Sequence, residues 1–289
     1  MKRLASVTLR KIESAGMPAA SYLLRNQVMS KRVSADGFAS LSDAQFSIDA
    51  KRSPDLVISG ASVLHVQSDQ LEQYLEDFKG RSSPKVLILG NCDRDWETFD
   101  QKLPSSVKRV YLQNSMMPND LMFQGIPIGL QNLRLGRNGM PHLFGKQYES
   151  REKSRKVMLG PFGETHPLRK TINNTDFSSH EDISLFTTRM PSIETAVRSA
   201  GFKFIGAPRG NGKDTHRFWE SLHRGSLPVV EDDIWADNME MLGIPFVRTS
   251  GWSGDELTAC ISSKVAPVSP RDIGPLWMDY WKKMIQDSF

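Results

Sequence analysis

The sequence contains little cysteine: only Cys92 and Cys260 occur among its 289 residues. Two thiols exclude a disulfide framework and a zinc site made of several thiolates, and they fit a reducing compartment. Long apolar runs are also missing, whereas a signal peptide needs roughly 7–15 consecutive apolar residues and a membrane span about 20. We therefore expect a cytoplasmic protein without a transmembrane segment.

A strong excess of one charge is absent as well. The chain has 37 basic and 33 acidic residues, which gives a net charge of +4. The basic residues are scattered along the sequence, whereas nucleic-acid-binding proteins usually concentrate them on one face or in a tail. We therefore expect no nucleic-acid partner and a few contacts to an anionic small molecule. The surface of an anionic membrane is an alternative that the charge leaves open.

Short β-branched and apolar runs alternate with stretches of helical periodicity, which is typical of parallel sheets with helical crossovers. A polar, glycine-containing passage at 134–156 interrupts the alternation and indicates a connection between two domains. We expect strands at 55–59, 85–90, 107–112, 126–130, 157–160, 202–205, 227–230 and 245–248, and helices at 69–79, 192–200, 215–224, 236–242, 255–265 and 276–286. The sequence thus predicts an α/β protein of two successive halves, 1–150 and 151–275, followed by a last helix at 276–289.

The segment 206–220 concentrates residues that carry chemistry, because it follows an expected strand and begins a helix. Gly210 and Gly212 permit a tight turn that would leave backbone N–H groups bare, and such amides at a helix N-terminus bind anions. Arg209, Lys213 and Arg217 add cations at the same place, and arginine can hold a phosphate through two parallel hydrogen bonds. These features predict a phosphate site.

The helix that follows has two chemically distinct faces. His216 and Glu220 lie four residues apart on one face, and Phe218, Trp219 and Leu222 lie on the opposite face, toward the core. A carboxylate one turn into the helix is well placed to accept hydrogen bonds from ribose hydroxyls. A nucleoside diphosphate lying across the helix start is the ligand that this pattern favours.

Known phosphate motifs fit this segment poorly. A P-loop would need glycine where Ala207 stands and a hydroxyl where Asp214 stands, and the dinucleotide pattern fails at Thr215. A P-loop kinase and a dehydrogenase are therefore disfavoured. The four-residue spacing of His216 and Glu220 could serve a metal, but no further ligands accompany it, and we expect no metal site.

The run Ala-Pro-Arg-Gly-Asn-Gly-Lys-Asp-Thr-His-Arg-Phe-Trp-Glu at 207–220, followed by Leu-Pro-Val-Val at 227–230, resembles the donor-binding signature of exostosin-like glycosyltransferases. The clear match covers 202–231. Weaker similarities are the Gln-Asn pair at 113–114, the Pro-Ile-Gly-Leu-Gln-Asn stretch at 127–132, in which Gln131 stands where an acid is common, and the His-Pro-Leu-Arg stretch at 166–169.

This resemblance implies a GT-B architecture, with two Rossmann-like domains facing a cleft and the last helix, 276–289, packing back toward the first domain. It also implies a UDP- or GDP-linked sugar as co-substrate, without another cofactor or a metal, because protein cations stabilise the leaving diphosphate. The residues that we expect to bind the donor are Arg169, Arg189, Arg209, Gly210, Asn211, Gly212, Lys213, Asp214, His216, Arg217 and Glu220.

An inverting transfer also needs a base for the acceptor hydroxyl. Asp93 and Asp95 follow the expected strand 85–90 directly, at the end where sites gather in parallel sheets. Helix capping explains each of them equally well. His166 is a third candidate, and Glu164 is a rival beside it.

Together these features predict a metal-independent, inverting glycosyltransferase, a hexosyl- or pentosyltransferase that acts on a glycan or another hydroxyl acceptor. The alternative is a protein that binds a nucleotide sugar or a carbohydrate without turning it over.

Overall fold

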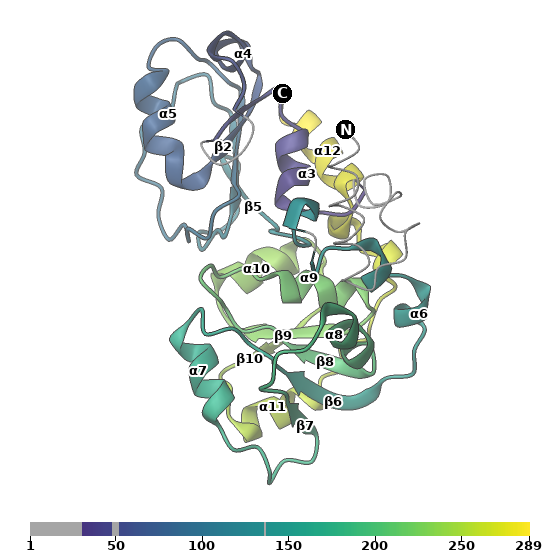
Figure 1. Ribbon diagram of the computed structural model, residues 1–289. Helices are drawn as coiled ribbons and strands as arrows, with labels where there is room; N and C mark the ends of the chain where they lie inside the picture. Colours follow the sequence, from purple (N-terminus) through teal and green to yellow (C-terminus); the bar gives the residue numbers. More distant parts are fainter. Residues whose placement is uncertain (1–30, 48–51, 136) are drawn as a thin grey trace, which may run out of the picture.

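The computed structural model describes residues 31–47, 52–135 and 137–289 and contains two α/β domains joined side by side (Figure 1). The first domain contains α3 (Ala35–Ser40), β1 (Ala44–Phe46), α4 (Asp55–Gly60), β2 (Val63–Gln67), η1 (Ser68–Gln70), α5 (Leu71–Asp77), β3 (Val86–Gly90), β4 (Arg109–Gln113) and β5 (Phe123–Ile126). The connecting segment contains η2 (Leu133–Leu135), η3 (Pro141–Leu143) and α6 (Lys146–Glu149).

The second domain and the C-terminal region complete the described chain. They contain β6 (Ser154–Leu159), α7 (Pro167–Asn174), β7 (Ile183–Leu185), α8 (Ser192–Ser199), β8 (Phe202–Gly206), α9 (His216–His223), β9 (Leu227–Glu231), α10 (Ile234–Met241), β10 (Val247–Thr249), α11 (Gly254–Ile261), η4 (Pro270–Asp272), η5 (Gly274–Leu276) and α12 (Met278–Gln286).

The first sheet is parallel and has the strand order β1-β2-β3-β4-β5. Successive side chains of a strand point to opposite faces, so both faces of β3 need cover. Leu87 and Leu89 pack in one cluster with Tyr74 of α5, and Val86 and Ile88 pack in another with α3 and α12. This two-sided burial explains why the run 85–90 reads as almost continuously apolar.

Helix α12 covers the first sheet although it comes from the end of the chain (Figure 1). Trp281 is fully buried in the cluster that contains Val86 and Ile88, and its ring meets that of Phe38 at 5.4 Å. The Trp281 indole also donates a hydrogen bond to the Pro275 carbonyl at 2.9 Å. Two distant parts of the sequence therefore build one hydrophobic core.

The second sheet is also parallel, with the order β10-β9-β8-β6-β7. The chain leaves β6 toward β7 on one side and then crosses to β8 on the other side. Loops that leave β6 and β8 consequently diverge at the carboxyl edge of the sheet. Such a reversal of strand order opens a crevice, which is where ligands bind in sheets of this kind.

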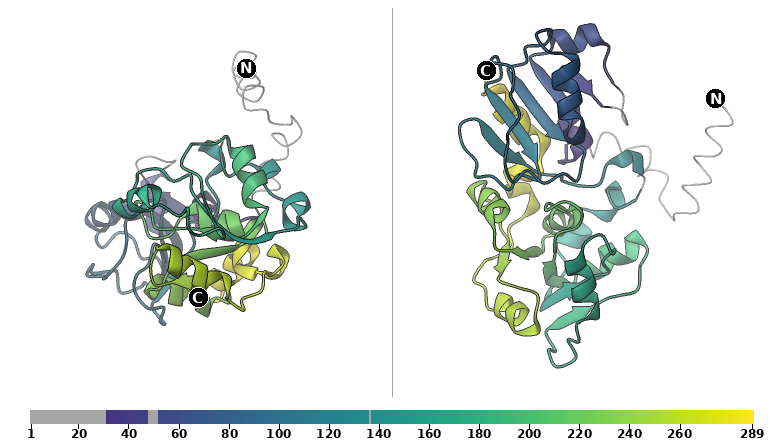
Figure 2. Two further views of the ribbon diagram at one scale, coloured as in Figure 1. Left: turned by 90° about the horizontal axis from the view of Figure 1, so that it is seen from below. Right: turned by 90° about the vertical axis from the view of Figure 1, so that its left-hand side faces the viewer.

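The two sheets present their carboxyl edges to each other. Asn114 after β4 and Ile128 after β5 make hydrogen bonds to Asp214 between β8 and α9, and Figure 2 shows the two domains in contact along this junction. The predicted α/β class with two Rossmann-like domains in a GT-B-like arrangement is confirmed. The limits of the domains at 150 and 275 stay predictions.

Several elements differ from expectation. The run 55–59 is the helix α4 and not a strand: Pro54 precedes it, Asp55 occupies its first turn and Gly60 ends it, all of which are helix signals. The fourth strand lies at Phe123–Ile126, a few residues before the expected 126–130. The strands β1 and β2 were not expected, because His65 and Gln67 interrupt the apolar run of β2.

The connection between the sheets is more ordered than its polar sequence indicates. Met140, Leu143, Phe144 and Tyr148 are buried and pack in one core cluster with residues of α9. The passage 134–156 therefore contributes to the second domain's core and is not a loose linker. Among the described residues, no helix is both long and apolar enough to cross a membrane.

The packing of α12 gives a test of the discontinuous first domain. Trp281→Ala would remove the largest side chain that α12 buries, and we expect a loss of about 3–5 kcal/mol in the free energy of unfolding. Urea unfolding followed by circular dichroism measures it. Lys282→Ala on the exposed side of the same helix is the matched control and should change stability by less than about 0.5 kcal/mol. Equal effects of the two substitutions would contradict this packing.

Candidate functional site

The candidate site lies at the reversal point of the second sheet, where the loop after β6 meets the turn 207–215 between β8 and α9. Thr215 is the N-cap residue of α9 and adopts extended backbone angles. The apolar side of α9 is buried as expected, with Phe218, Trp219 and Leu222 all in the core. This burial fixes the helix so that its first turn points toward the junction between the domains.

Two arginines lie at this point without a carboxylate partner. Arg217 donates to the carbonyls of Gly160 and Pro161 at 2.5 and 3.0 Å, and Arg169 donates to those of Pro208 and Arg209, both at 2.9 Å. In the described part of the chain neither guanidinium forms an ion pair within 4.0 Å. Both charges are therefore fixed in place without a carboxylate in direct contact, and Glu220 and Glu231 act on them only at longer range.

Burial affects both guanidinium groups without removing their charge. It lowers the pKa of Arg217 to about 10, with the Glu220 carboxylate opposing the shift, and it also lowers the pKa of Arg169. Both groups stay protonated at neutral pH. Each also lies over the ring of Phe162, with its central carbon 5.7 Å (Arg169) and 5.2 Å (Arg217) from the ring centroid. A cation pair held by carbonyls and one aromatic face is suited to an anion.

The expectation of a bare glycine turn is wrong for four of its amides. The N–H of Arg209 donates to Glu231, and that of Gly210 donates to the Gly212 carbonyl. Those of Lys213 and Asp214 donate across the junction to side-chain oxygens of the first domain. Among the described residues, only Asn211 and Gly212 in the span 209–214 have amides without a partner.

Gly212 is required by close approach to the first domain. A Cβ atom at this position would lie 2.8–3.0 Å from the side-chain atoms of Asn114. Asn114 has a positive φ of 58° and accepts the Asp214 N–H at 2.8 Å while donating to the Cys92 carbonyl at 3.2 Å. Because residue 212 is glycine, the turn can approach the first domain closely enough to contact the Asn114 side chain.

Lys213 does not face an anion as expected. Its side chain is almost fully buried, and its ammonium pairs with Glu231 at 2.8 Å and Asp233 at 2.5 Å. Glu231 also accepts from the Trp252 indole at 3.2 Å. Two carboxylates already satisfy this cation, so it anchors the turn and is not available to a phosphate.

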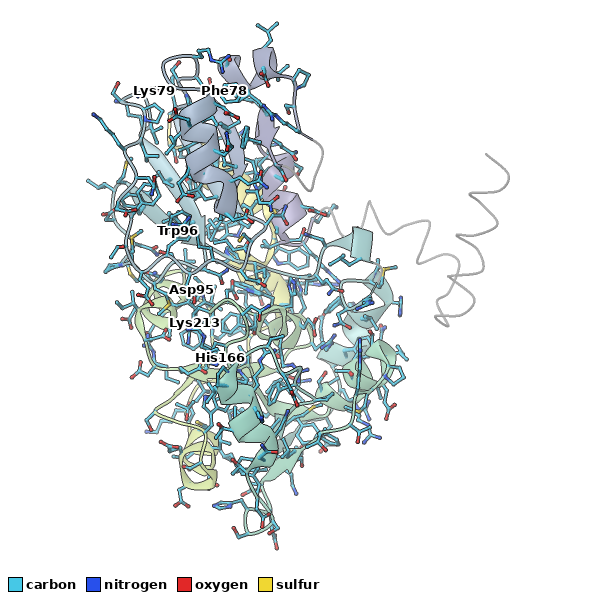
Figure 3. All side chains as sticks on the ribbon, turned by 60° about the vertical axis from the view of Figure 1, so that its left-hand side comes forward. Phe78, Lys79, Asp95, Trp96, His166 and Lys213 are labelled. Atoms are coloured by element: carbon cyan, nitrogen blue, oxygen red, sulfur yellow. The ribbon has the colours of Figure 1, made fainter. Side chains whose placement is uncertain are left out.

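Asp95 and Asp93 of the first domain both contact the turn. Asp95 pairs with Arg209 at 2.5 Å and accepts the Lys213 N–H at 2.8 Å, so it ties the domains together (Figure 3). Asp93 is exposed, and its carboxylate accepts from the Asn211 amide at 3.1 Å. Of the two carboxylates, only Asp93 keeps free access to solvent.

Asp214 and His216 also join the domains. Asp214 is buried and accepts from the Ile128 N–H at 2.7 Å and the Trp219 indole at 2.8 Å. Burial raises its pKa to about 7, although these donors act in the opposite direction. The Nδ1 atom of His216 is 2.8 Å from the Gly129 carbonyl, which accepts from the ring. Both residues hold the start of α9 against the loop that follows β5.

The remaining expected residues lie around the turn 207–215 or farther from it. Glu220 is buried, and its carboxylate is 3.4 Å from Arg224. His166 caps α7 by accepting the Leu168 N–H at 3.2 Å, and burial and the nearby Arg209 lower its pKa. Arg189 is exposed and lies apart from the turn, on the wall of a neighbouring cavity.

Two adjoining cavities open at this place. The cleft cavity, of about 510 Å³, is lined by residues of both domains, including Asp93, Arg169, Asn211, Gly212, Arg217 and Glu220. The side cavity, of about 400 Å³, continues from it along the second domain toward Arg189 and Thr195. Gln131, Asn138, Pro161, Phe162, Gly163, Arg217 and Glu220 line both of them. An elongated ligand could therefore extend from one cavity into the other.

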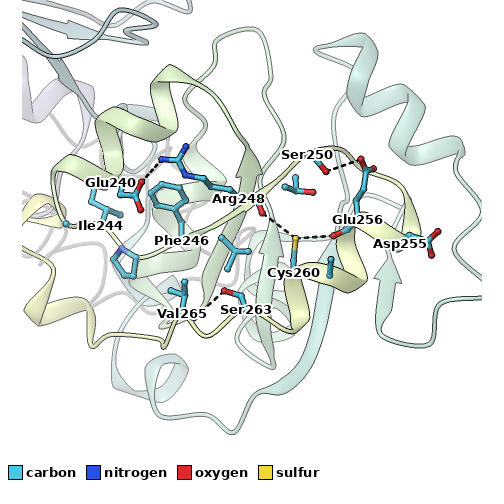
Figure 4. A pocket seen from close by; sticks show the side chains of 15 residues that line it. Glu240, Ile244, Phe246, Arg248, Ser250, Asp255, Glu256, Cys260, Ser263 and Val265 are labelled. Atoms are coloured by element: carbon cyan, nitrogen blue, oxygen red, sulfur yellow. Dashed lines mark hydrogen bonds and ion pairs between the residues drawn. The ribbon is translucent and has the colours of Figure 1, made fainter.

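A further cavity, of about 890 Å³, lies elsewhere, between β10 and α11 (Figure 4). Its cation, Arg248, is neutralised by Asp232, Asp237 and Glu240 at 2.5–2.8 Å, and these carboxylates raise its pKa. None of the residues that the sequence selects lines this cavity. It therefore lacks the cations without a carboxylate in direct contact that distinguish the cleft cavity.

The chain matches no known sequence family and has a distant structural likeness to a solved glycosyltransferase. No family model matches the chain, and no curated protein matches it either. Among solved structures, the chain is similar to AviGT4, a glycosyltransferase involved in avilamycin A biosynthesis. The sequences are 10% identical, the match covers 81% of this chain and 87% of that one, and the TM-score is 0.42. A likeness this distant transfers neither substrate nor mechanism.

The sequence did not single out Glu231 and Asp233. Glu231 is the last residue of β9 and Asp233 comes two residues later, at the same end of a parallel strand that drew attention to Asp93 and Asp95 after β3. The rule that sites gather at the carboxyl ends of parallel strands would therefore have selected these two carboxylates as well.

Within the described residues, no group of three or more His, Cys, Asp or Glu side chains is arranged to hold a metal ion.

The contact between Gly212 and Asn114 gives a test of the junction. Gly212→Ala should cost about 1–3 kcal/mol of stability because its methyl group would overlap the Asn114 side chain. In an Asn114→Ala background the same substitution should cost less, and urea unfolding of the four proteins measures the coupling. Gly60→Ala, where open space surrounds the added atom, is the control. Additive costs within about 0.5 kcal/mol would contradict the contact.

Proposed function

We propose that this protein is a glycosyltransferase that moves a sugar from a nucleotide-activated donor to a hydroxyl acceptor. The observation that carries the proposal is the pair of guanidinium groups without a carboxylate in direct contact, Arg169 and Arg217, on the wall of a cavity between two facing carboxyl edges. The resemblance of 202–231 to the donor-binding signature of exostosin-like enzymes supports the same reading.

The donor diphosphate would bind between Arg169 and Arg217. The free amides of Asn211 and Gly212 and the first turn of α9 add N–H donors at the same cavity. The Thr215 hydroxyl, which is buried and has no partner among the described residues, is a further donor there.

The nucleoside would then extend into the side cavity. Glu220 lies where the two cavities join, which is the position required of a carboxylate that accepts from ribose hydroxyls. Phe162 offers an aromatic face beside it, and Arg189 lies farther along the side cavity. This placement keeps the sugar in the cleft cavity, opposite the first domain.

Fixed charges would do most of the catalytic work. As the glycosidic bond breaks, negative charge grows on the leaving diphosphate, and donors already aimed at it stabilise the transition state by several kcal/mol without rearranging. Arg169 and Arg217 meet that condition because carbonyl oxygens hold both guanidinium groups in place. We propose a metal-independent transfer on this basis.

Asp93 is the proposed base. Its carboxylate lines the cleft cavity from the first domain, whereas the arginines line it from the second, and it is exposed. A base on this side would take the proton of an acceptor hydroxyl that attacks the sugar from the face opposite the leaving group, which inverts the anomeric configuration. The Asn211 amide, 3.1 Å away, would orient the carboxylate.

One observation favours a second function, that of a nucleotide-sugar-binding protein without turnover. Both candidate aspartates already accept hydrogen bonds from the turn, Asp95 from two donors and Asp93 from one. If neither is released to an acceptor, the donor site remains but the chemistry is lost. Release of nucleoside diphosphate from donors separates the two functions.

Thermal denaturation with UDP-linked and GDP-linked sugars tests the donor class directly. A ligand that binds only the folded protein raises the melting temperature through linkage, and a concentration of about 100 times Kd adds about 2.7 kcal/mol. We expect a rise with one nucleotide class and with its free diphosphate. No rise with any member of the panel would overturn the proposed donor site.

The arginine pair gives a sharper prediction. Arg217→Ala and Arg169→Ala should each weaken binding of the preferred nucleoside diphosphate at least about tenfold, because each removes a charge-assisted contact. Titration calorimetry measures it. Arg271→Ala, an exposed arginine outside both cavities, is the matched control. Binding of the nucleoside without phosphates should change little; an equal loss for nucleoside and diphosphate would mean that the arginines only support the loop.

The base is tested by comparing two neighbouring aspartates. Asp93→Asn should lower kcat by about 10²–10⁴ and leave diphosphate affinity unchanged, because it removes proton acceptance only. Asp95→Asn should instead lower stability, since it weakens the ion pair with Arg209. The readouts are diphosphate release with a panel of sugar acceptors and the melting temperature. Undiminished turnover by the Asp93→Asn protein would exclude Asp93 as the base.

A further inference from the structure

The edge of the first sheet that faces away from the cleft gathers basic residues that are far apart in the sequence. Lys85 and Lys108 lie side by side, because the Lys108 N–H donates to the Lys85 carbonyl at 2.7 Å. The segments 79–85 and 104–109, which lead into β3 and β4, contain no acidic residue and five basic ones: Lys79, Arg81, Lys85, Lys108 and Arg109. Their charge of +5 exceeds the +4 of the whole chain.

Exposed apolar side chains flank these cations on both sides. Leu56 on α4 is 86% exposed, and Leu121 before β5 is 93% exposed. The Ser82 hydroxyl donates to the Ile58 carbonyl at 3.2 Å, which places α4 beside the first basic segment. Leu121, Lys108 and Phe289 line one hollow of about 360 Å³ beside the second. We call this surface, 56–57, 79–85, 104–109 and 121, the distal edge.

Several acidic groups near the distal edge already accept hydrogen bonds or pair with an arginine, whereas Glu76 beside Lys79 is exposed. Asp43 accepts the amides of Ser62 and Val63, both at 2.9 Å, and Asp120 accepts those of Met122 and Phe123 at 2.7 and 2.6 Å. Asp55 pairs with Arg52, and Asp287 lies on the wall of the hollow. Within the described chain, Lys79, Lys85 and Lys108 form no ion pair. Their charge is therefore available to a partner.

We propose that the distal edge docks on the surface of an anionic lipid bilayer. Lysines at such a surface are attracted by the anionic headgroups, and protruding leucines gain by leaving water for the interfacial layer. A nucleic acid would match the cations alone and leave Leu56 and Leu121 in water. The combination of highly exposed leucines with lysines that form no ion pair in the described chain, on one edge, selects the bilayer.

The docked orientation leaves the cleft accessible. Figure 3 shows Phe78 and Lys79 at one end of the molecule, with Asp95, Lys213 and His166 toward its middle. The five-residue strand β3 spans the distance between the two edges, which is about 17 Å at 3.3 Å per residue. The cleft is thus held off the membrane and faces sideways to it, so that docking and ligand binding do not compete.

Co-sedimentation of the full chain with vesicles tests the proposal, without any nucleotide present. We expect binding to phosphatidylcholine vesicles that contain about 30 mol% phosphatidylglycerol and none to pure phosphatidylcholine. Lys79→Glu/Lys85→Glu/Lys108→Glu should weaken binding at least about tenfold, since each cation near an anionic surface contributes roughly fivefold. Lys146→Glu/Lys170→Glu/Lys264→Glu makes the same charge change on exposed lysines of the other domain and should bind almost normally.

Leu56→Gln/Leu121→Gln keeps the charge and distinguishes a bilayer from a polyanion. It should weaken vesicle binding severalfold and leave retention on heparin or single-stranded RNA unchanged. The proposal is overturned if anionic vesicles do not retain the protein, if both lysine triples weaken binding equally, or if the leucine variant binds vesicles like the wild type. Because no donor is involved, its failure is separate from failure of the proposed enzymatic function.

Discussion

The structure depends on one junction, the set of hydrogen bonds that ties the turn 208–215 to the first domain. Asp95 holds Arg209 and the Lys213 amide, Asn114 holds the Asp214 amide, and the Asp214 carboxylate holds Ile128 in return. These contacts join the carboxyl edges of two sheets through groups that are mostly buried, where an unmade bond is costly. Both walls of the cleft cavity are therefore fixed by the same few side chains.

The cations near the turn fall into two groups that differ in their partners. Lys213 and Arg209 are neutralised by carboxylates, so their charge is used in holding the turn. Arg169 and Arg217 are held by neutral carbonyls, and neither contacts a carboxylate within the described chain. Of the three cations that the segment 206–220 concentrates, two therefore hold the turn, and Arg217 lies on the cavity wall beside Arg169 of α7.

Much of this organisation could be predicted from local pattern. The glycine turn, the buried face of α9 and the parallel sheets follow from residue spacing, which local rules capture. The partners of Lys213 could not be predicted, because Glu231 and Asp233 lie 18 and 20 residues away and meet it only through the neighbouring strand β9. The distal edge could not be predicted either, because its basic residues are scattered along the chain. They become neighbours only when the parallel strands align.

The error at 55–59, where a strand is expected and a helix is found, comes from weighing two local signals wrongly and not from a distant contact. Its β-branched residues outweighed the proline and aspartate that begin a helix there, so a weak propensity was preferred to a stronger boundary signal.

The return of α12 to the first sheet also bears on how the chain is made. During synthesis the first domain emerges early, but the face formed by Val63, Val86 and Ile88 has only the cover that α3 provides until Trp281 has left the ribosome. For the time needed to translate about 200 residues, roughly 10–40 s at the usual elongation rates, the part of that apolar face which α12 covers stays open to water. Completion of the first domain's core therefore waits for the residues of α12.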